Sequence, residues 1–185
     1  GAERTELRTT TLTTGLLETQ LQTTKNEKGR KRTDVQTALA SKGVRFTRTD
    51  GISATSDEMR ADLLTQEVDF NGPDVVLTRG ESSVRGTDMR LSSKDNSIDV
   101  RSAGSIRHVD GTDAKPGETA RKSTAIGEVH LSWLSLMKFN DSTGEGECIG
   151  AVKLTQEQDR LHRTTIDGER VAIYMESAAV NKARV

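Results

Sequence analysis

The chain of 185 residues is long enough for one domain, and only 32% of its residues are apolar. Its 27 Lys and Arg balance 28 Asp and Glu, so the net charge is −1 and no nucleic-acid partner is expected, because such binding draws much of its affinity from positive charge. No apolar run approaches the ~20 residues of a membrane-spanning helix. The many Thr, Val and Ile, with only two Pro, favour a folded β protein over a disordered chain.

Four leucines stand among threonines near the start of the chain: Leu12, Leu16, Leu17 and Leu21. They would fit one face of a helix, yet the β-branched Thr around them favours strands. We predict two strands, at about 5–22 and 33–41, joined by a charged turn at 25–32. We expect this turn to be a hairpin tip whose Lys and Arg side chains are solvated. The alternative is that these side chains contact lipid phosphate.

From residue 43 onward, apolar and polar residues alternate with a period of two, which is typical of strands with one buried face. The runs are separated by dipeptides that tolerate the positive φ of hairpin turns: Asp50-Gly51, Asn71-Gly72, Asp95-Asn96 and Asp167-Gly168. We therefore predict a meander of antiparallel strands. Residues 110–126 interrupt the alternation with Gly, Pro, Asp and Lys, which predicts a long exposed loop.

Residues 59–70 and 89–100 form a faint internal repeat, 30 residues apart. Each copy contains two short alternating runs and is followed by a glycine, Gly72 or Gly104. A repeat of this kind indicates a sheet that is extended by adding similar units.

A set of segments carries a recurring pattern in which alternating apolar residues accompany a Gly or a turn: ALASKGVRF (38–46), GISATSDEM (51–59), FNGPDVVL (70–77), VRGTDMRL (84–91), IDV (98–100), WLSLMKF (133–139) and CIGAV (148–152). In this order the segments resemble the rungs of the OstA-like periplasmic proteins of lipopolysaccharide transport. The resemblance covers about residues 35–177 and rests on the recurrence of the rungs. The loop at 110–126 and the charged turn at 25–32 depart from the simplest members.

That resemblance implies an all-β fold, namely an open antiparallel β-jellyroll, or β-taco, built from repeated short rungs. We expect a single domain over residues 1–185, with rungs at about 5–109 and 127–177. It also implies an interior that accepts the acyl chains of lipopolysaccharide or a related lipid. The first residues, GAER, lack the basic and apolar regions of a signal peptide, so the periplasmic location rests on the resemblance.

The resemblance further implies that the sheet edges pair with other bridge components by β-strand addition. Copies of this chain could pair with one another in the same way and form a homo-oligomer. The clean alternation at 171–175 is the candidate for one edge and the Thr-rich strand at 5–14 for the other. The alternative is a monomer in which both strands are capped inside the fold.

Large residues on the inward side of the alternation are the candidates for a lipid groove: Phe46, Ile52, Met59, Val68, Phe70, Leu77, Met89, Ile98, Val100, Trp133, Met137 and Phe139. Met can repack around a variable ligand. Core packing is the alternative role for each of these residues, because any β-sandwich fills its interior by one-sided alternation.

Patterns that mark enzymes or metal sites are missing. His108, His130 and His162 fall in different rungs, without the ligand spacing of a zinc or calcium site. The acidic stretch 144–147 would repel phosphate and is predicted as a loop. The single Cys148 cannot close an internal disulfide. We therefore expect no enzymatic activity, no metal and no cofactor.

The leading hypothesis is a non-catalytic lipid-binding protein of lipopolysaccharide export, which serves biogenesis of the outer membrane. One alternative is a structural β-filament or β-helix that polymerises through its edges, although a β-helix requires more even rungs than these. The other is a carbohydrate-binding β-sandwich module. Such modules usually expose aromatic platforms, whereas this chain has one Trp, one Tyr and three Phe, most of them inward.

Overall fold

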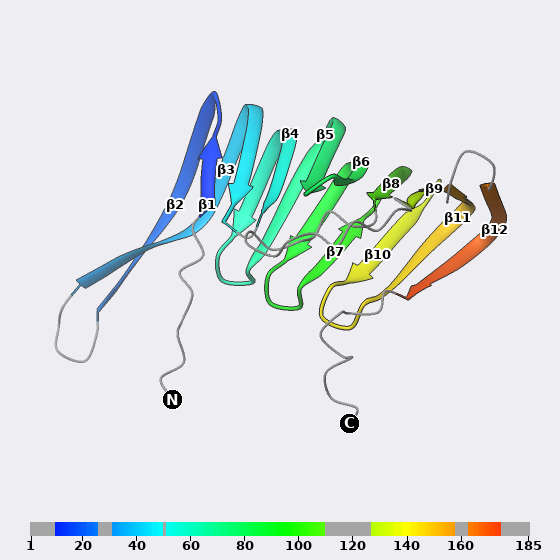
Figure 1. The fold of residues 1–185 in the computed structure, drawn as a ribbon. Helices are drawn as coiled ribbons and strands as arrows, with labels where there is room; N and C mark the ends of the chain where they lie inside the picture. Colours follow the sequence, from blue (N-terminus) through cyan, green and yellow to red (C-terminus); the bar gives the residue numbers. More distant parts are fainter. Residues whose placement is uncertain (1–9, 26–30, 50, 110–126, 158–162, 175–185) are drawn as a thin grey trace, which may run out of the picture.

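The computed structural model describes residues 10–25, 31–49, 51–109, 127–157 and 163–174, and the regular elements in these ranges are β-strands. They are β1 (Thr10–Thr13), β2 (Leu16–Lys25), β3 (Lys31–Arg48), β4 (Ile52–Asp62), β5 (Glu67–Arg79), β6 (Ser82–Ser92), β7 (Ser97–Val100), β8 (Gly104–Val109), β9 (Glu128–Trp133), β10 (Leu136–Asn140), β11 (Glu145–Glu157) and β12 (Arg163–Tyr174). All belong to one antiparallel sheet, which Figure 1 shows running from the blue β1 and β2 to the orange β12.

Most of the long strands bend near their middle. β5 pairs with β6 along its length, yet the register shifts between Asn71 and Val75, as at a β-bulge. The pairings of β3 with β4, β4 with β5 and β11 with β12 shift at the corresponding level. β7 and β8 are two halves of one bent strand, because they pair with opposite halves of β6. β9 and β10 divide in the same way against β11.

Because the bends are aligned, the sheet folds over on itself into two layers (Figure 1). Layer A contains the segments 16–25, 31–41, 58–62, 67–71, 88–92, 97–100, 136–140, 145–149 and 170–174. Layer B contains the segments 10–13, 44–48, 52–56, 75–79, 82–86, 104–109, 128–133, 152–157 and 163–168. We call the two rows of strand ends and turns farthest from the bends lip A and lip B.

The register places one inward residue of each strand in a continuous row across each layer. The row of layer A is Leu17, Ala40, Met59, Phe70, Met89, Val100, Met137, Cys148 and Val171. The row of layer B is Leu12, Phe46, Ala54, Leu77, Val84, Ile106, Leu131, Leu154 and Ile166. The rows meet inside the fold, where the rings of Phe46 and Phe70 pack edge to face with centroids 5.5 Å apart. The hydrophobic core therefore lies between the layers.

The structure confirms the predicted all-β fold, an open antiparallel jellyroll. The internal repeat is also confirmed, because Met59 pairs with Phe70 and Met89 pairs with Val100 in two hairpins of layer A. The N-terminal leucines lie on strands, as predicted, but the predicted strand at 5–22 is divided into β1 and β2, and the predicted strand at 33–41 is part of the longer β3. The predicted charged turn, the loop at 110–126 and the ends of both candidate edges fall partly or wholly outside the described residues.

Three turn and loop predictions are wrong. Asn71-Gly72 lies inside β5, at its bend, and Asp167-Gly168 lies inside β12. A bulge and a hairpin turn both need residues that tolerate unusual φ, so the dipeptides alone do not separate them. Most of the stretch 144–147 is the start of β11. Gly146 is required there by packing, because a Cβ on it would lie 2.8 Å from the ring of Phe139.

The part of the chain that the structure describes contains no helix with the length and apolar character needed to cross a bilayer.

Gly104 tests the close packing at the bend. A Cβ at this position would lie 2.6 Å from Trp133 Cζ2 and against the backbone carbonyl of Arg85. We expect Gly104→Ala to lower the free energy of unfolding by about 1–3 kcal/mol, because the added methyl overpacks the core. Urea denaturation measures this change. Gly168→Ala is the control, since its Cβ would meet no atom closer than 3.7 Å; equal losses in the two variants would contradict the packing argument.

Candidate functional site

A cavity of about 420 Å³ lies between the two layers. The apolar residues that line it come from both layers: Ile52, Leu77, Val84, Ile106, Val129, Leu131 and Leu154 of layer B, and Leu91, Ile98, Met137, Phe139 and Ile173 of layer A. Its volume falls within the range of about 300–1,000 Å³ that is typical of ligand sites. The cavity is thus large enough for a ligand and mainly aliphatic in character.

Incomplete closure of the layers produces this cavity. Met89 and Val100 are fully buried in the core, whereas Val84, Ile98 and Ile106 keep part of their surface uncovered. All five occupy inward positions that the strand alternation assigns to the interior. Aliphatic surface that the protein does not cover itself is free to bury the apolar part of a ligand.

Polar residues surround the mouth of the cavity. Arg48, Ile52, Arg79, Ser82 and His108 occupy successive inward positions along lip B. Ser82 Oγ and His108 Nδ1 lie 3.0 Å apart and share a hydrogen bond. Lip B therefore combines two arginines and an imidazole around one aliphatic side chain.

Lip A has a different polarity. Asn96, Asp141 and Tyr174 line the mouth on this side. Among the described residues that line the cavity, Asp141 is the one carboxylate. Its Oδ2 lies 3.5 Å from Nη1 of Arg79, so an ion pair joins the lips across the mouth. Both side chains are more than half exposed, at 58% and 53%, which limits the strength of this contact.

All twelve residues predicted for a lipid groove lie on the inner faces of the layers. The structure divides them into two groups. Five line the cavity: Ile52, Leu77, Ile98, Met137 and Phe139. Seven pack in or against the core cluster and do not line the cavity: Phe46, Met59, Val68, Phe70, Met89, Val100 and Trp133. Lipid contact stays a prediction for all twelve residues, and the five that line the cavity are the ones that a ligand there would touch directly.

Sequence reasoning missed several lining residues. Val84 and Ile106 are not among the twelve residues predicted for the groove, although they follow Leu77 in the inward row of layer B. Alternation within each of their strands would have placed both side chains inward. The polar residues of the mouth, Arg79 and Asp141, gave no such signal, because 61 residues separate them in the chain and the fold brings them together.

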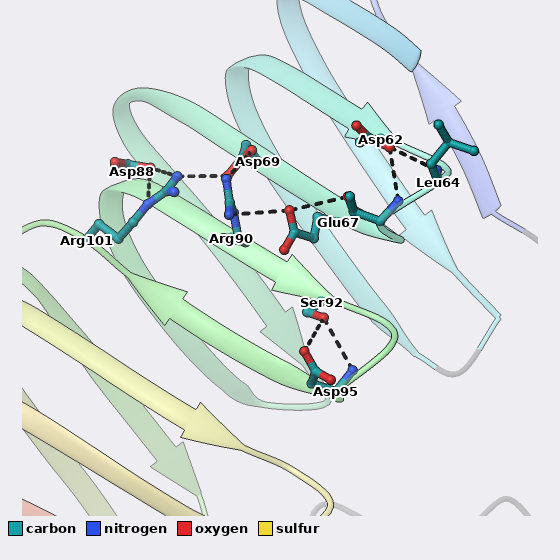
Figure 2. A network of polar contacts seen from close by, with 10 residues as sticks. Asp62, Leu64, Glu67, Asp69, Asp88, Arg90, Ser92, Asp95 and Arg101 are labelled. Carbon is teal, nitrogen blue, oxygen red and sulfur yellow. Dashed lines mark hydrogen bonds and ion pairs between the residues drawn. The ribbon is translucent and has the colours of Figure 1, made fainter. Parts of the chain in front are cut away.

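The outer face of layer A carries a row of alternating charges. The register gives one member per strand: Arg60, Asp69, Arg90, Asp99, Lys138 and Glu147. Figure 2 shows its centre, where Arg90 Nε lies 2.8 Å from Asp69 Oδ1 and Arg101 Nη2 lies 2.8 Å from the same oxygen. Opposite charges on neighbouring strands favour this register, since a slip would separate the pairs.

Asp69 is the acceptor at the centre of this network. Burial acts to raise the pKa of its carboxyl, but the hydrogen bonds and positive charges of Arg90 and Arg101 outweigh burial and hold the pKa below its ordinary value of 3.8. The ionised carboxylate therefore stabilises the folded state at neutral pH.

We expect Asp69→Asn to lower the free energy of unfolding at pH 7 by about 1 kcal/mol, a value discounted for partial exposure. A depressed folded-state pKa stabilises above the unfolded value and loses its effect as the pH falls through the folded value. The difference between the variant and the wild type should therefore shrink below pH 3.8. Urea denaturation across this pH range checks it. Asp74→Asn removes an exposed ion pair with Arg85 and should change stability by less than about 0.5 kcal/mol.

The other reactive side chains in the described ranges lie apart from the cavity and from one another. Cys148 is fully buried, and desolvation raises the pKa of its thiol to about 12, so it is a neutral core residue. His130 Nε2 lies 2.9 Å from Glu128 on the outer face, away from the cavity. No group of three or more metal-ligating side chains occurs among the described residues, and His162 lies outside them.

Comparison with known proteins finds no matching family model and no matching curated protein. Among solved structures, the chain is similar to the crystal structure of LptH, the LptA homologous periplasmic component of the conserved lipopolysaccharide transport device from Pseudomonas aeruginosa. The two sequences are 18% identical, and the alignment covers 67% of this chain and 78% of that chain with a TM-score of 0.49.

Proposed function

We propose that the chain is a non-catalytic lipid-binding protein that holds acyl chains in the apolar cavity between its two layers. The observation that carries this proposal is the cavity itself, about 420 Å³ of aliphatic space with a polar mouth. Each methylene removed from water contributes about 0.8 kcal/mol, so even part of an acyl chain would bind measurably. A polar mouth suits the headgroup of the same molecule, which stays in water.

Lipopolysaccharide export is the process we propose for this activity, with a periplasmic location. The support is the ordered series of rungs that resembles the OstA-like proteins, together with an interior that can receive acyl chains. The proposed ligand is lipopolysaccharide or a related lipid.

The sheet edges suit the transfer of such a lipid. Within the described residues, β12 pairs only with β11, and β1 and β2 pair only with β3. Strand addition at such an edge draws affinity from main-chain hydrogen bonds. It would also extend the apolar interior into a neighbour, since Leu17 and Ile166 end the inward rows and are about half exposed. We propose that other bridge components, or further copies of this chain, pair there.

Site-specific photo-crosslinking in cells tests lipid binding. Phe139 lines the cavity, and its neighbour Lys138 points to the outer face of the same strand. We expect p-benzoylphenylalanine at position 139 to yield a lipopolysaccharide adduct, detected by immunoblotting, and the same residue at position 138 to yield none. Equal labelling of the two positions, or labelling of neither, would contradict the proposal.

Assembly through β12 is tested by an inward charge on this edge strand. We expect Ile166→Lys to raise the concentration needed for oligomers about tenfold or more, because strand addition would bury an unpaired ammonium. Analytical ultracentrifugation over a concentration series measures this change. Thr165→Lys places the same charge on the outer face and should assemble like the wild type. A wild type that stays monomeric with and without lipid would rule out self-assembly and leave only pairing with another protein.

A further inference from the structure

The charged side chains that line the mouth of the cavity differ between the two lips, and the difference indicates which lipids fit. Arg48 and Arg79 line the mouth on lip B, whereas Asp141 lines it on lip A. The aliphatic lining begins directly beside the arginines, because Ile52 lies between them in the row of inward positions. A ligand with its tail in the cavity would therefore bring its headgroup next to these two side chains.

We propose that Arg79 is a specificity-determining residue that binds the anionic headgroup of an amphiphile whose tail occupies the cavity, and that this headgroup takes the place of Asp141. The inference rests on the proposed function, since it needs an apolar tail between the layers. The inference adds to that function the charge of the ligand and the residue that recognises this charge.

The geometry of the Arg79–Asp141 pair suits such an exchange. The 3.5 Å separation is longer than the ~2.8 Å of a strong charge-assisted hydrogen bond. Exposed pairs of this kind contribute little net stability, because both ions are well solvated when apart. Arg79 is thus held beside the mouth by a contact that costs little to replace.

A phosphate or carboxylate can replace Asp141 with better geometry. The guanidinium presents its N–H donors as a planar fork that matches two oxygens of such a group. Arg48 lines the same mouth. An uncharged headgroup gains none of these interactions, so the lips discriminate by charge while the cavity recognises the tail.

Matched amphiphiles test the inference on the full chain. Isothermal titration calorimetry compares dodecyl phosphate with dodecyl maltoside, both below their micelle concentrations, and includes inorganic phosphate alone. We expect Arg79→Gln to weaken dodecyl phosphate about fivefold and to leave dodecyl maltoside unchanged. Asp141→Asn should tighten dodecyl phosphate, because it removes a competing and repelling anion, and should also leave the maltoside unchanged.

Arg85→Gln is the matched control. Arg85 pairs with Asp74 at 3.3 Å and has a similar exposure of 57%, but it lies on the outer face. It should alter the affinity for neither amphiphile. Thermal melting of each variant confirms that the fold is retained.

The outcomes separate the two proposals. If both amphiphiles bind the wild type and Arg79→Gln weakens them equally or not at all, the role of Arg79 is wrong and lipid binding stands. If inorganic phosphate binds as tightly as dodecyl phosphate, the tail contributes nothing and the inference is overturned. If neither amphiphile binds the wild type, the proposed function and this inference both fail.

Discussion

The bend in the long strands gives the fold its interior and both of its layers. A straight antiparallel sheet of this length would leave one apolar face in water, at a cost proportional to its area. Register shifts at one level in β3, β4, β5 and β11 fold the sheet so that this face closes on itself. One chain of hairpins thereby builds both walls of the core without a second sheet or a covering helix.

The same inward rows serve two purposes. Where the layers meet, Phe70 and Met89 are completely buried and stabilise the fold. Where the layers separate, Ile98 and Phe139 continue these faces but leave aliphatic surface uncovered. The cavity wall and the packed core therefore come from one pattern of residues, and the spacing between the layers decides to which of the two a side chain belongs.

The outer face contributes in another way. Its alternating charges, centred on Asp69, favour one strand register and so hold the inward residues on the correct side. Leu17 and Ile166, the exposed ends of the inward rows, lie on β2 and β12, which pair on one side only within the described residues. Edges of this kind are normally blunted, and an apolar residue flanking each of them is what the proposed strand addition would require.

Alternation in the sequence predicted most of the strands and the face to which each of their residues belongs, because a period of two is a local property of an extended chain. It therefore placed all twelve candidate residues on the inner faces. It did not determine that Asn71-Gly72 bends a strand instead of ending it, since a bulge and a turn require similar residues. Nor did it distinguish Phe70, which packs in the core, from Phe139, which lines the cavity. It also gave no sign that Arg79 and Asp141 form an ion pair. Those outcomes depend on how far apart the two layers lie and how they are offset, and only the folded sheet sets that geometry.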